Sequence, residues 1–365
     1  MSDFSARISS LATSLQRASI ECIFITPSAD LRYFTGYNAL PLERLTCLAV
    51  RSDCTATLLV PRLEFSAAAT HNPEANGIAL HSWEETQDPF NVLADIVGPV
   101  RSAVVNDVMW AQKVFGIQQA FGVSVSIAGR MVSDLRAIKS QREIEAIVSA
   151  GQAIDQVHSN MAQWLRPGRT EREVGRDIAD AIIASGHTQV DFVIVASGPN
   201  GASPHHEVSD RIIQSGEPIV VDIGGTMPSG YCSDSTRMYA CGDVVNEFKE
   251  HYGVLLQAQE TAVATACQGM TGAEVDAIAR NILQESDLGE YFIHRTGHGL
   301  GLETHEEPYI VASNSEQLVP GNVFSIEPGF YIPNRFGARI EDIVYLTDSG
   351  AMSVNNTPHS LTIID

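Results

Sequence analysis

The sequence is poor in basic residues and has no long apolar run. Lysine and arginine together number 23, against 44 aspartates and glutamates, and the formal net charge is −21. A surface of this charge repels phosphate backbones and anionic lipids, so we expect neither nucleic acid nor a membrane as a partner. The polar N-terminal segment resembles neither a signal peptide nor a transmembrane span. We interpret most of the charge as serving solubility, with some carboxylates available to bind hard cations.

The six cysteines form no CxxC pair, and residues 20–130 contain no glycine-rich phosphate loop. Several of the cysteines lie in apolar, strand-like runs such as residues 45–48. We therefore interpret them as buried, reduced thiols of a cytoplasmic protein. A site without cysteine ligands also differs from the usual structural zinc site.

The length and the sequence pattern both indicate two domains. The chain has 365 residues, more than one hydrophobic core usually serves. Residues 20–130 alternate short β-branched runs with short helical segments, which is typical of an α/β domain. From Ser140 onward, capping boxes begin longer helices, the first predicted to run to about Leu165. We place the boundary near residue 135 and predict domains 1–134 and 135–365.

A short internal repeat runs through the predicted C-terminal domain. Thr170 and Thr271 each follow a glycine turn after a long helix, and each begins a Thr-x-x-Glu-Val sequence. Strand-like runs follow both copies. We interpret them as two helix–helix–strand halves around a sheet whose inner face can hold a site. Chance similarity of two capping boxes is the alternative for so short a match.

Four carboxylates lie in strand or turn context rather than in acidic surface runs. Asp222 ends an apolar run, and Asp234 follows it across a turn, so a β-hairpin brings the two face to face. Glu327 and Glu341 each interrupt an apolar run that we interpret as a strand. Four buried carboxylates without a cation repel one another and have raised pKa values. Two divalent ions relieve that repulsion.

His298 completes the set in the glycine-rich sequence Thr-Gly-His-Gly-Leu-Gly. The flanking glycines leave room around the imidazole. A lone histidine is more often structural than a ligand, and the four acids are what favour the ligand role. Carboxylates with one histidine suit Mn²⁺, Co²⁺ or Zn²⁺. We predict two divalent metal ions, with Mn²⁺ favoured.

The strings VVDIGG, YCSDSTR, TGHGLGLETHE, SIEPGFY and RIEDIV resemble those of the pita-bread metallopeptidases. That family includes Xaa-Pro dipeptidase (prolidase), aminopeptidase P and methionine aminopeptidase. The resemblance covers about residues 135–350, and the first domain is similar to that of the prolidase, aminopeptidase P and creatinase branch. It implies an α+β fold: a C-terminal pita-bread domain with pseudo-repeated halves, preceded by a smaller α/β creatinase-like domain. The spacing from Asp222 to Asp234 is one residue longer than the family pattern, so we expect an extra residue in the hairpin turn.

The resemblance also implies a role for each donor. Asp222 binds one metal through both oxygens, Asp234 and Glu341 bridge both metals, and His298 and Glu327 complete the second. Two such ions share a hydroxide and lower its pKa toward neutrality. Glu327 is then the candidate for carrying a proton to the leaving nitrogen.

Two further histidines are expected to contact substrate. By resemblance, His305, which follows the metal-binding His298 by seven residues, contacts the substrate, and His205 stabilises the substrate carbonyl. A surface-loop role is the alternative for both, and it is the role that we assign to the adjacent His206.

Strand alternation extends the site to neighbouring residues. Arg339 lies two residues before Glu341, so a shared strand face lets it orient bound carboxylates. Thr236 shares a face with Asp234 and is expected to hydrogen-bond a ligand. Arg237 and Asp342 are expected to point the other way and to be structural.

By resemblance, the activity is hydrolysis of the peptide bond before proline, with short proline-containing peptides as substrates and a homodimer as the assembly. An Xaa-Pro bond is a tertiary amide without an N–H group, so it resists peptidases that need that donor. The compact catalytic half favours Xaa-Pro dipeptidase, and aminopeptidase P acting on Xaa-Pro-Yaa peptides is the alternative. The five donors disfavour a metal-free creatinase-like hydrolase and a non-catalytic binding protein. Methionine aminopeptidases usually lack such a first domain.

Overall fold

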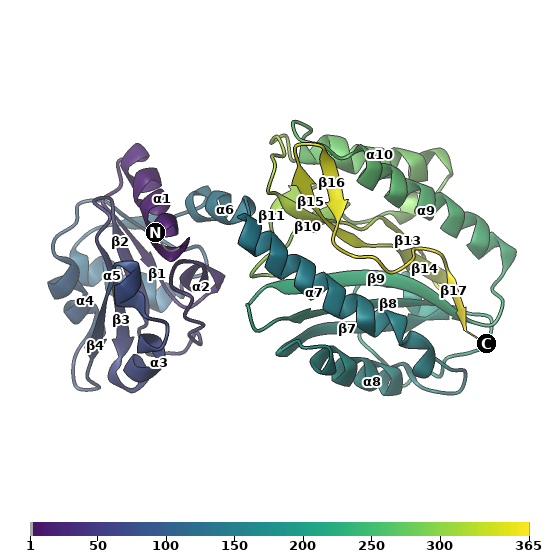
Figure 1. The fold of residues 1–365 in the computed structure, drawn as a ribbon, viewed down its shortest axis with the longest axis horizontal. Helices are drawn as coiled ribbons and strands as arrows, with labels where there is room; N and C mark the ends of the chain where they lie inside the picture. The colour runs from purple at the N-terminus through teal and green to yellow at the C-terminus, as the bar shows by residue number, and fades with distance from the viewer. Residues whose placement is uncertain (1–2, 365) are drawn as a thin grey trace. The chain divides into compact units, whose positions relative to one another are not determined.

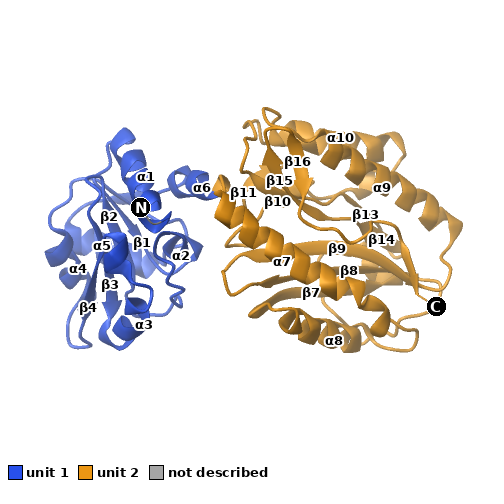
Figure 2. Cartoon of the chain, viewed as in Figure 1, with its two compact units in different colours: residues 1–136 blue, residues 137–365 orange. Residues whose placement is uncertain are grey.

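The computed structural model describes residues 3–364, in two compact units. Unit 1 comprises residues 1–136 and unit 2 comprises residues 137–365 (Figure 2). Among the described residues, no helix has both the length and the apolar character needed to cross a membrane.

Unit 1 is a mixed six-stranded sheet with strand order β4-β3-β2-β1-β5-β6. The strands are β1 (Cys22–Ile25), β2 (Cys47–Arg51), β3 (Ala56–Pro61), β4 (Ile78–Trp83), β5 (Ala103–Val105) and β6 (Val125–Ile127). The helices are α1 (Asp3–Arg17), α2 (Ala29–Thr35), α3 (Phe65–Ala69), α4 (Pro89–Val97), α5 (Ala111–Phe121) and α6 (Arg130–Ala137), with 3₁₀ turns η1 (Arg62–Glu64) and η2 (Pro73–Asn76). The six strands confirm the alternation of β-branched runs and helical segments predicted for residues 20–130, and each of them except β6 contains buried residues.

Unit 2 begins with two helices and an antiparallel sheet. The helices are α7 (Gln141–Ser159) and α8 (Glu171–Ala184), with η3 (Met161–Gln163) between them. The strands are β7 (Gln189–Ser197), β8 (Pro218–Thr226) and β9 (Cys232–Cys241), with η4 (Gly198–Ala202) after β7. The last strand of the chain, β17 (Thr362–Ile364), pairs in parallel with β9.

The second half of unit 2 repeats this plan. Its helices are α9 (Asn246–Thr265) and α10 (Gly272–Glu285), followed by η5 (Gly289–Tyr291). Its strands are β10 (Gly297–Gly299), β11 (Glu306–Ile310), β12 (Val323–Ile326), β13 (Gly329–Ile332), β14 (Phe336–Arg339), β15 (Asp342–Thr347) and β16 (Gly350–Ser353). Five of them form a sheet of order β11-β10-β12-β15-β16, and β13 pairs with β14. Figure 1 shows α7 and α8 against β7–β9, and α9 and α10 beside the strands of the second half.

The backbone confirms the internal repeat. Thr170 and Thr271 both cap their helices through complete capping boxes. The glycine of each preceding turn donates its N–H to a later strand-like segment, Gly168 to Ile213 and Gly269 to Leu318. Because these long-range bonds recur at matching places, the similarity is one of tertiary structure and not of capping boxes alone.

The first helix of unit 2 ends earlier than predicted. α7 stops at Ser159, whereas the apolar pattern predicts a helix to about Leu165. The side chains of Ser159 and Asn160 donate to carbonyl oxygens four residues earlier, at Asp155 and Gln156. These bonds close the last turn with side-chain groups, and a 3₁₀ turn follows.

One apolar core covers the helix-facing side of β8, and a second joins Val220 and Met238 on the other side to residues of the second half. Alternate residues of β8, including Val221 and Ile223, pack with Ile154 of α7 and Ile178 of α8. The intervening positions, including Asp222, point to the other side of the same strand. The fold thus buries one face of β8 against helices and presents the other to the second half.

Candidate metal centre

The hairpin of β8 and β9 places both aspartates on one face. Asp222 is opposite Thr236, and Gly224 is opposite Asp234. All four positions therefore share a face, with the two aspartates diagonal to each other. The predicted hairpin is confirmed, but it places the two carboxylates diagonally on one face and not directly opposite each other.

The two glutamates lie at breaks between strands, so our interpretation of them as mid-strand residues is wrong. Residues 327–328 separate β12 from β13, and residues 340–341 separate β14 from β15. Pro328 lacks an N–H and interrupts the ladder there. The N–H of Glu327 instead donates to Thr296, and that of Glu341 donates to Thr236 of the other half.

His298 lies in β10, whose neighbours approach too closely for side chains. A Cβ at Gly297 would collide with the carbonyl of Ser325, and one at Gly299 with that of Glu307. The glycines are therefore needed for strand packing, more than for the room around the imidazole that the sequence suggests. His298 Nδ1 lies 3.1 Å from the Gly299 carbonyl oxygen, which only a protonated Nδ1 satisfies. Nε2 faces the acids, 3.1 Å from Glu327 Oε1: with a proton it donates to that carboxylate, and without one its lone pair can bind a cation.

The five predicted donors lie together. One donor atom from each of Asp234, His298 and Glu341 lies within 4.8 Å of the other two. Asp222 and Glu327 line the same cavity, which has a volume of about 700 Å³. His298 Nε2 is 3.1 Å from Glu327 Oε1 and 3.8 Å from Asp234 Oδ2. Side chains from β8, β9, β10 and the two strand breaks thus converge on one point.

The electrostatics of this cluster favour a bound cation. Burial, and then the charges of the neighbouring carboxylates, raise the pKa values of Asp234 and Glu341 well above the ordinary range. Asp222 Oδ1 and Glu341 Oε1 are buried and accept no hydrogen bond from any residue that the structure describes. Buried oxygens without a partner are costly, and divalent ions need such oxygen ligands. The donor set therefore fits divalent metal ions.

Glu327 differs from Asp234 and Glu341 in the direction of its pKa shift. Burial alone raises the pKa of a carboxyl group, but the hydrogen bond from His298 and the nearby positive charges outweigh burial and lower the pKa of Glu327 to about 2. The Ser325 hydroxyl also donates to its Oε1 at 3.0 Å. Our expectation that all four acids have raised pKa values is therefore wrong for Glu327.

Arg339 and Thr236 bind the donors as expected. Arg339 Nη2 donates to Asp222 Oδ2 at 2.5 Å, and its Nε donates to Thr236 Oγ1 at 3.1 Å. The Thr236 hydroxyl then donates to Glu341 Oε2 at 2.8 Å. One arginine therefore orients two carboxylates, Asp222 directly and Glu341 through the threonine.

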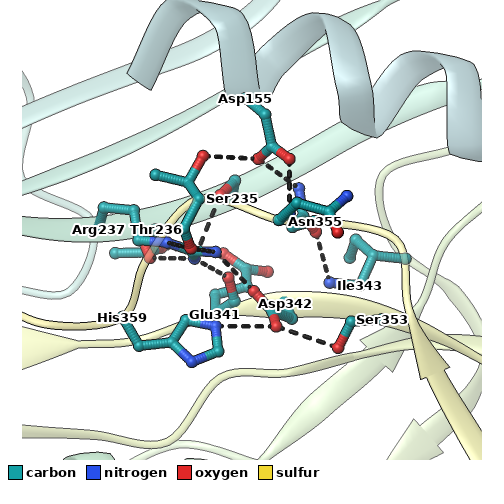
Figure 3. Close-up of polar contacts among 12 residues, drawn as sticks. Asp155, Ser235, Thr236, Arg237, Glu341, Asp342, Ile343, Ser353, Asn355 and His359 are labelled. Carbon is teal, nitrogen blue, oxygen red and sulfur yellow. Dashed lines mark hydrogen bonds and ion pairs between the residues drawn. The ribbon is translucent and has the colours of Figure 1, made fainter. Parts of the chain in front are cut away.

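Arg237 and Asp342 form a separate, buried network beside Glu341 (Figure 3). Their ion pair measures 2.7 Å, and Arg237 Nη1 also donates to the backbone carbonyl of Glu341. His359 Nε2 lies 2.9 Å from the second oxygen of Asp342. This network holds the Glu341 backbone from the side opposite to its carboxylate, which confirms the predicted structural role.

The expected substrate histidines line the cavity. The ring of His305 lies 4.0 Å from that of His298, centroid to centroid. Burial, with the neighbouring His298, lowers the pKa of His305 to about 4, so it is neutral at pH 7. His205 lines the cavity from the loop after η4. His206 also lines it and lies 2.8 Å from buried Glu171, so its assignment to a surface loop is wrong.

Sequence reasoning missed three residues at the site. His294 Nε2 lies 2.9 Å from the hydroxyl of Tyr331, which accepts a hydrogen bond from Arg339 at 2.6 Å. Arg295 also lines the cavity. For His294 and Arg295, the sequence signal was their position directly before the Thr-Gly-His segment that contains His298.

Models of two protein families match the chain. The model of metallopeptidase family M24 matches residues 145–348, and that of the creatinase/prolidase N-terminal domain matches residues 7–138. Each match lies almost wholly within one of the two compact units.

Named relatives span the whole chain. Probable dipeptidase PepE of Mycobacterium tuberculosis is 45% identical over 363 residues, which are 99% of this chain and 96% of that protein. The structure of dipeptidase PepE from Mycobacterium ulcerans is 46% identical with a TM-score of 0.93, covering 99% of this chain and 98% of that chain. A prolidase from Thermococcus sibiricus is 35% identical with a TM-score of 0.91, covering 100% of both chains. This chain therefore belongs to metallopeptidase family M24, with a creatinase-like N-terminal domain followed in sequence by a pita-bread catalytic domain.

Proposed function

We propose that this chain is an Xaa-Pro dipeptidase that uses two divalent metal ions, with Mn²⁺ favoured. The observation that carries the proposal is the convergence of four carboxylates and one histidine in a buried cavity, with two carboxylate oxygens left without partners. Relatives named dipeptidase and prolidase that align over nearly the full length support the substrate class. The complete donor set disfavours a metal-free hydrolase and a non-catalytic protein.

Asp222 would hold one ion, Asp234 and Glu341 would hold both, and His298 and Glu327 would complete the second. Two divalent ions supply Lewis acidity that activates water and polarises the scissile carbonyl. The Nδ1–H bond of His298 to Gly299 leaves Nε2 free as a donor atom. Arg339 keeps Asp222 oriented for the same purpose.

The protein's own groups move the proton and hold the substrate. Glu327 is ionised at neutral pH because of its lowered pKa, so it can accept a proton and pass it to the leaving nitrogen of proline. His305 is neutral at pH 7 and can donate an N–H to the substrate carbonyl without adding charge. His205, which lines the same cavity, is the second candidate for this contact.

The metal, the compartment and the assembly are further parts of the proposal. Carboxylates with a single histidine suit Mn²⁺, and Co²⁺ or Zn²⁺ is the alternative. All six cysteines are free thiols, which is consistent with a reducing cytoplasm. We also propose a homodimer.

A substrate panel tests the proposal. Protein loaded with Mn²⁺ is assayed with Ala-Pro, Ala-Pro-Ala and Ala-Ala. We expect Ala-Pro to have the highest kcat/KM. A higher value for Ala-Pro-Ala would instead indicate aminopeptidase P, which uses the same five donors. Equal cleavage of Ala-Ala would contradict proline specificity.

A further inference from the structure

We propose that Arg295 binds the free C-terminal carboxylate of the substrate and so limits cleavage to dipeptides. This inference rests on the proposed function, because it assumes a peptide bound at the five donors. It assigns substrate length to one side chain that lies outside the donor set.

Arg295 presents an unused cation to the cavity. Its side chain is half-buried and lines the same cavity as the donors. Its guanidinium carbon lies 4.3 Å from the centre of the Tyr309 ring. Within residues 3–364, no carboxylate forms an ion pair with this guanidinium and no acceptor takes a hydrogen bond from it. Its five N–H donors are therefore available to a ligand.

The other arginine of the cavity is already committed. Of the lysines and arginines that the structure describes, only Arg295 and Arg339 line this cavity. Arg339 donates hydrogen bonds to Asp222, Thr236 and Tyr331, so its guanidinium is already engaged by groups of the metal centre. A substrate carboxylate that enters this acidic cavity needs a cation to offset the repulsion, and Arg295 is the one that is not engaged.

The backbone around Arg295 is held on both sides. Thr296 donates its N–H and its hydroxyl to Asp276 Oδ1, at 3.1 and 2.8 Å. Arg280 Nη2 donates to the carbonyl of His294 at 2.8 Å and forms an ion pair with Asp276. These bonds fix the residues before and after Arg295, and Tyr309 restrains its guanidinium plane. The cation is therefore preorganised, which lowers the entropic cost of binding an anion.

Arg295 also lies close to the reacting centre. It lines the same cavity as His305 and lies three residues before His298 in the chain. The His305 ring is itself 4.0 Å from that of His298. A carboxylate one residue beyond the scissile bond is the anion that such a position can reach. Arginine pairs with carboxylate through two parallel hydrogen bonds, which lysine or histidine does not match.

Matched substrates and variants test this assignment. Wild type, R295Q, R295K and the control R335Q are loaded with Mn²⁺, and kcat/KM is measured for Ala-Pro, Ala-Pro-amide and Ala-Pro-Asp-amide. Arg335 is the control because it also lies near an aromatic ring, Phe336, but outside this cavity. Metal content and thermal unfolding are measured on every sample.

We expect wild type to prefer Ala-Pro over Ala-Pro-amide by ~10-fold or more, the usual scale for a charge-assisted hydrogen bond. R295Q should lower this preference by ~10-fold or more, mainly through KM, R295K should restore part of it, and R335Q should keep it. Equal losses on acid and amide, or an unchanged preference, would overturn the proposal. Ala-Pro-Asp-amide as the substrate most affected by R295Q would also overturn it, because the anion recognised would then be a side chain.

A binding measurement separates this proposal from the proposed function. If wild type cleaves none of the three substrates, the proposed function fails, and kinetics no longer report on Arg295. Calorimetry with an uncleavable Ala-Pro analogue, whose peptide bond is reduced, and with its amide then decides. Tighter binding of the acid that R295Q abolishes supports the carboxylate site, and equal binding of acid and amide by wild type overturns it.

Discussion

At the scale of single residues, the centre depends on which carboxylate oxygens already have partners. Among residues 3–364, Asp222 has one oxygen bound by Arg339 and the other without a partner. Glu341 has one oxygen bound by Thr236 and the other without a partner. Each acid is thus held through one oxygen and offers the other. The bound oxygen keeps each acid oriented before an ion binds to the other oxygen.

Glu327→Gln should reduce kcat by ~100-fold or more, the usual effect of losing a positioned acid–base group. Ser325 donates to Oε1 and can donate equally to an amide oxygen, so we expect the fold to be retained. Metal content is measured alongside kcat, because glutamine is also a poorer ligand. Normal turnover with normal metal content would remove Glu327 from proton transfer.

His205→Ala and His305→Ala should each lower kcat/KM while metal stoichiometry stays near that of wild type. The reason is that both line the cavity, but neither belongs to the cluster of donor atoms within 4.8 Å formed by Asp234, His298 and Glu341. His81→Ala, in β4 of unit 1, serves as the control. Metal loss in His305→Ala would show that this histidine is a ligand instead.

At the scale of elements, one helix end organises the loop that contains His205. Glu171, in the first turn of α8, is fully buried and accepts hydrogen bonds from Ser197, Asn200 and Ser209, with His206 Nε2 at 2.8 Å. These partners lie on both sides of His205 in the chain. Burial raises the pKa of Glu171, but these hydrogen bonds outweigh burial and lower it below the ordinary value.

Glu171→Gln should lower the free energy of unfolding by about 1–3 kcal/mol, the cost of leaving buried polar groups poorly paired. Glu173→Gln is the matched control, since Glu173 lies two residues further along α8 but is exposed in the capping box. Because the folded pKa of Glu171 is lowered, its contribution is present above the ordinary carboxyl pKa and is lost as the pH falls toward the folded value. Chemical denaturation at pH 7 and pH 4 measures both effects. Equal stabilities of the Glu171→Gln and Glu173→Gln variants at pH 7 would contradict this account.

The sequence predicts elements better than their ends and loops. The donors were recognisable because an acid inside an apolar run, such as Asp222, is costly without a partner. The strand breaks at Glu327 and Glu341 were not recognisable, because they depend on backbone hydrogen bonds to Thr296 and Thr236, which are distant in the sequence. His206 was misassigned for the same reason, since its partner Glu171 is remote in sequence.

At the scale of the whole molecule, the metal centre should also stabilise the catalytic domain. Burial and mutual repulsion raise the pKa values of Asp234 and Glu341. An ion that binds the folded state relieves this repulsion and adds binding free energy to folding. We expect Mn²⁺ to raise the Tm of the chelator-treated protein by several degrees, whereas Asp234→Ala should show a much smaller rise. Equal rises in the two proteins would contradict this link.

The most direct test of the central claim is a titration of chelator-treated protein with Mn²⁺, in which bound metal and Ala-Pro hydrolysis are measured on the same samples. The account predicts negligible hydrolysis without metal and activity that reaches its plateau at about two ions per chain, the number that the five donors suit. Asp234→Ala should bind little metal and remain inactive. Full hydrolysis by the metal-free protein, or a plateau at one ion per chain, would contradict the two-metal centre.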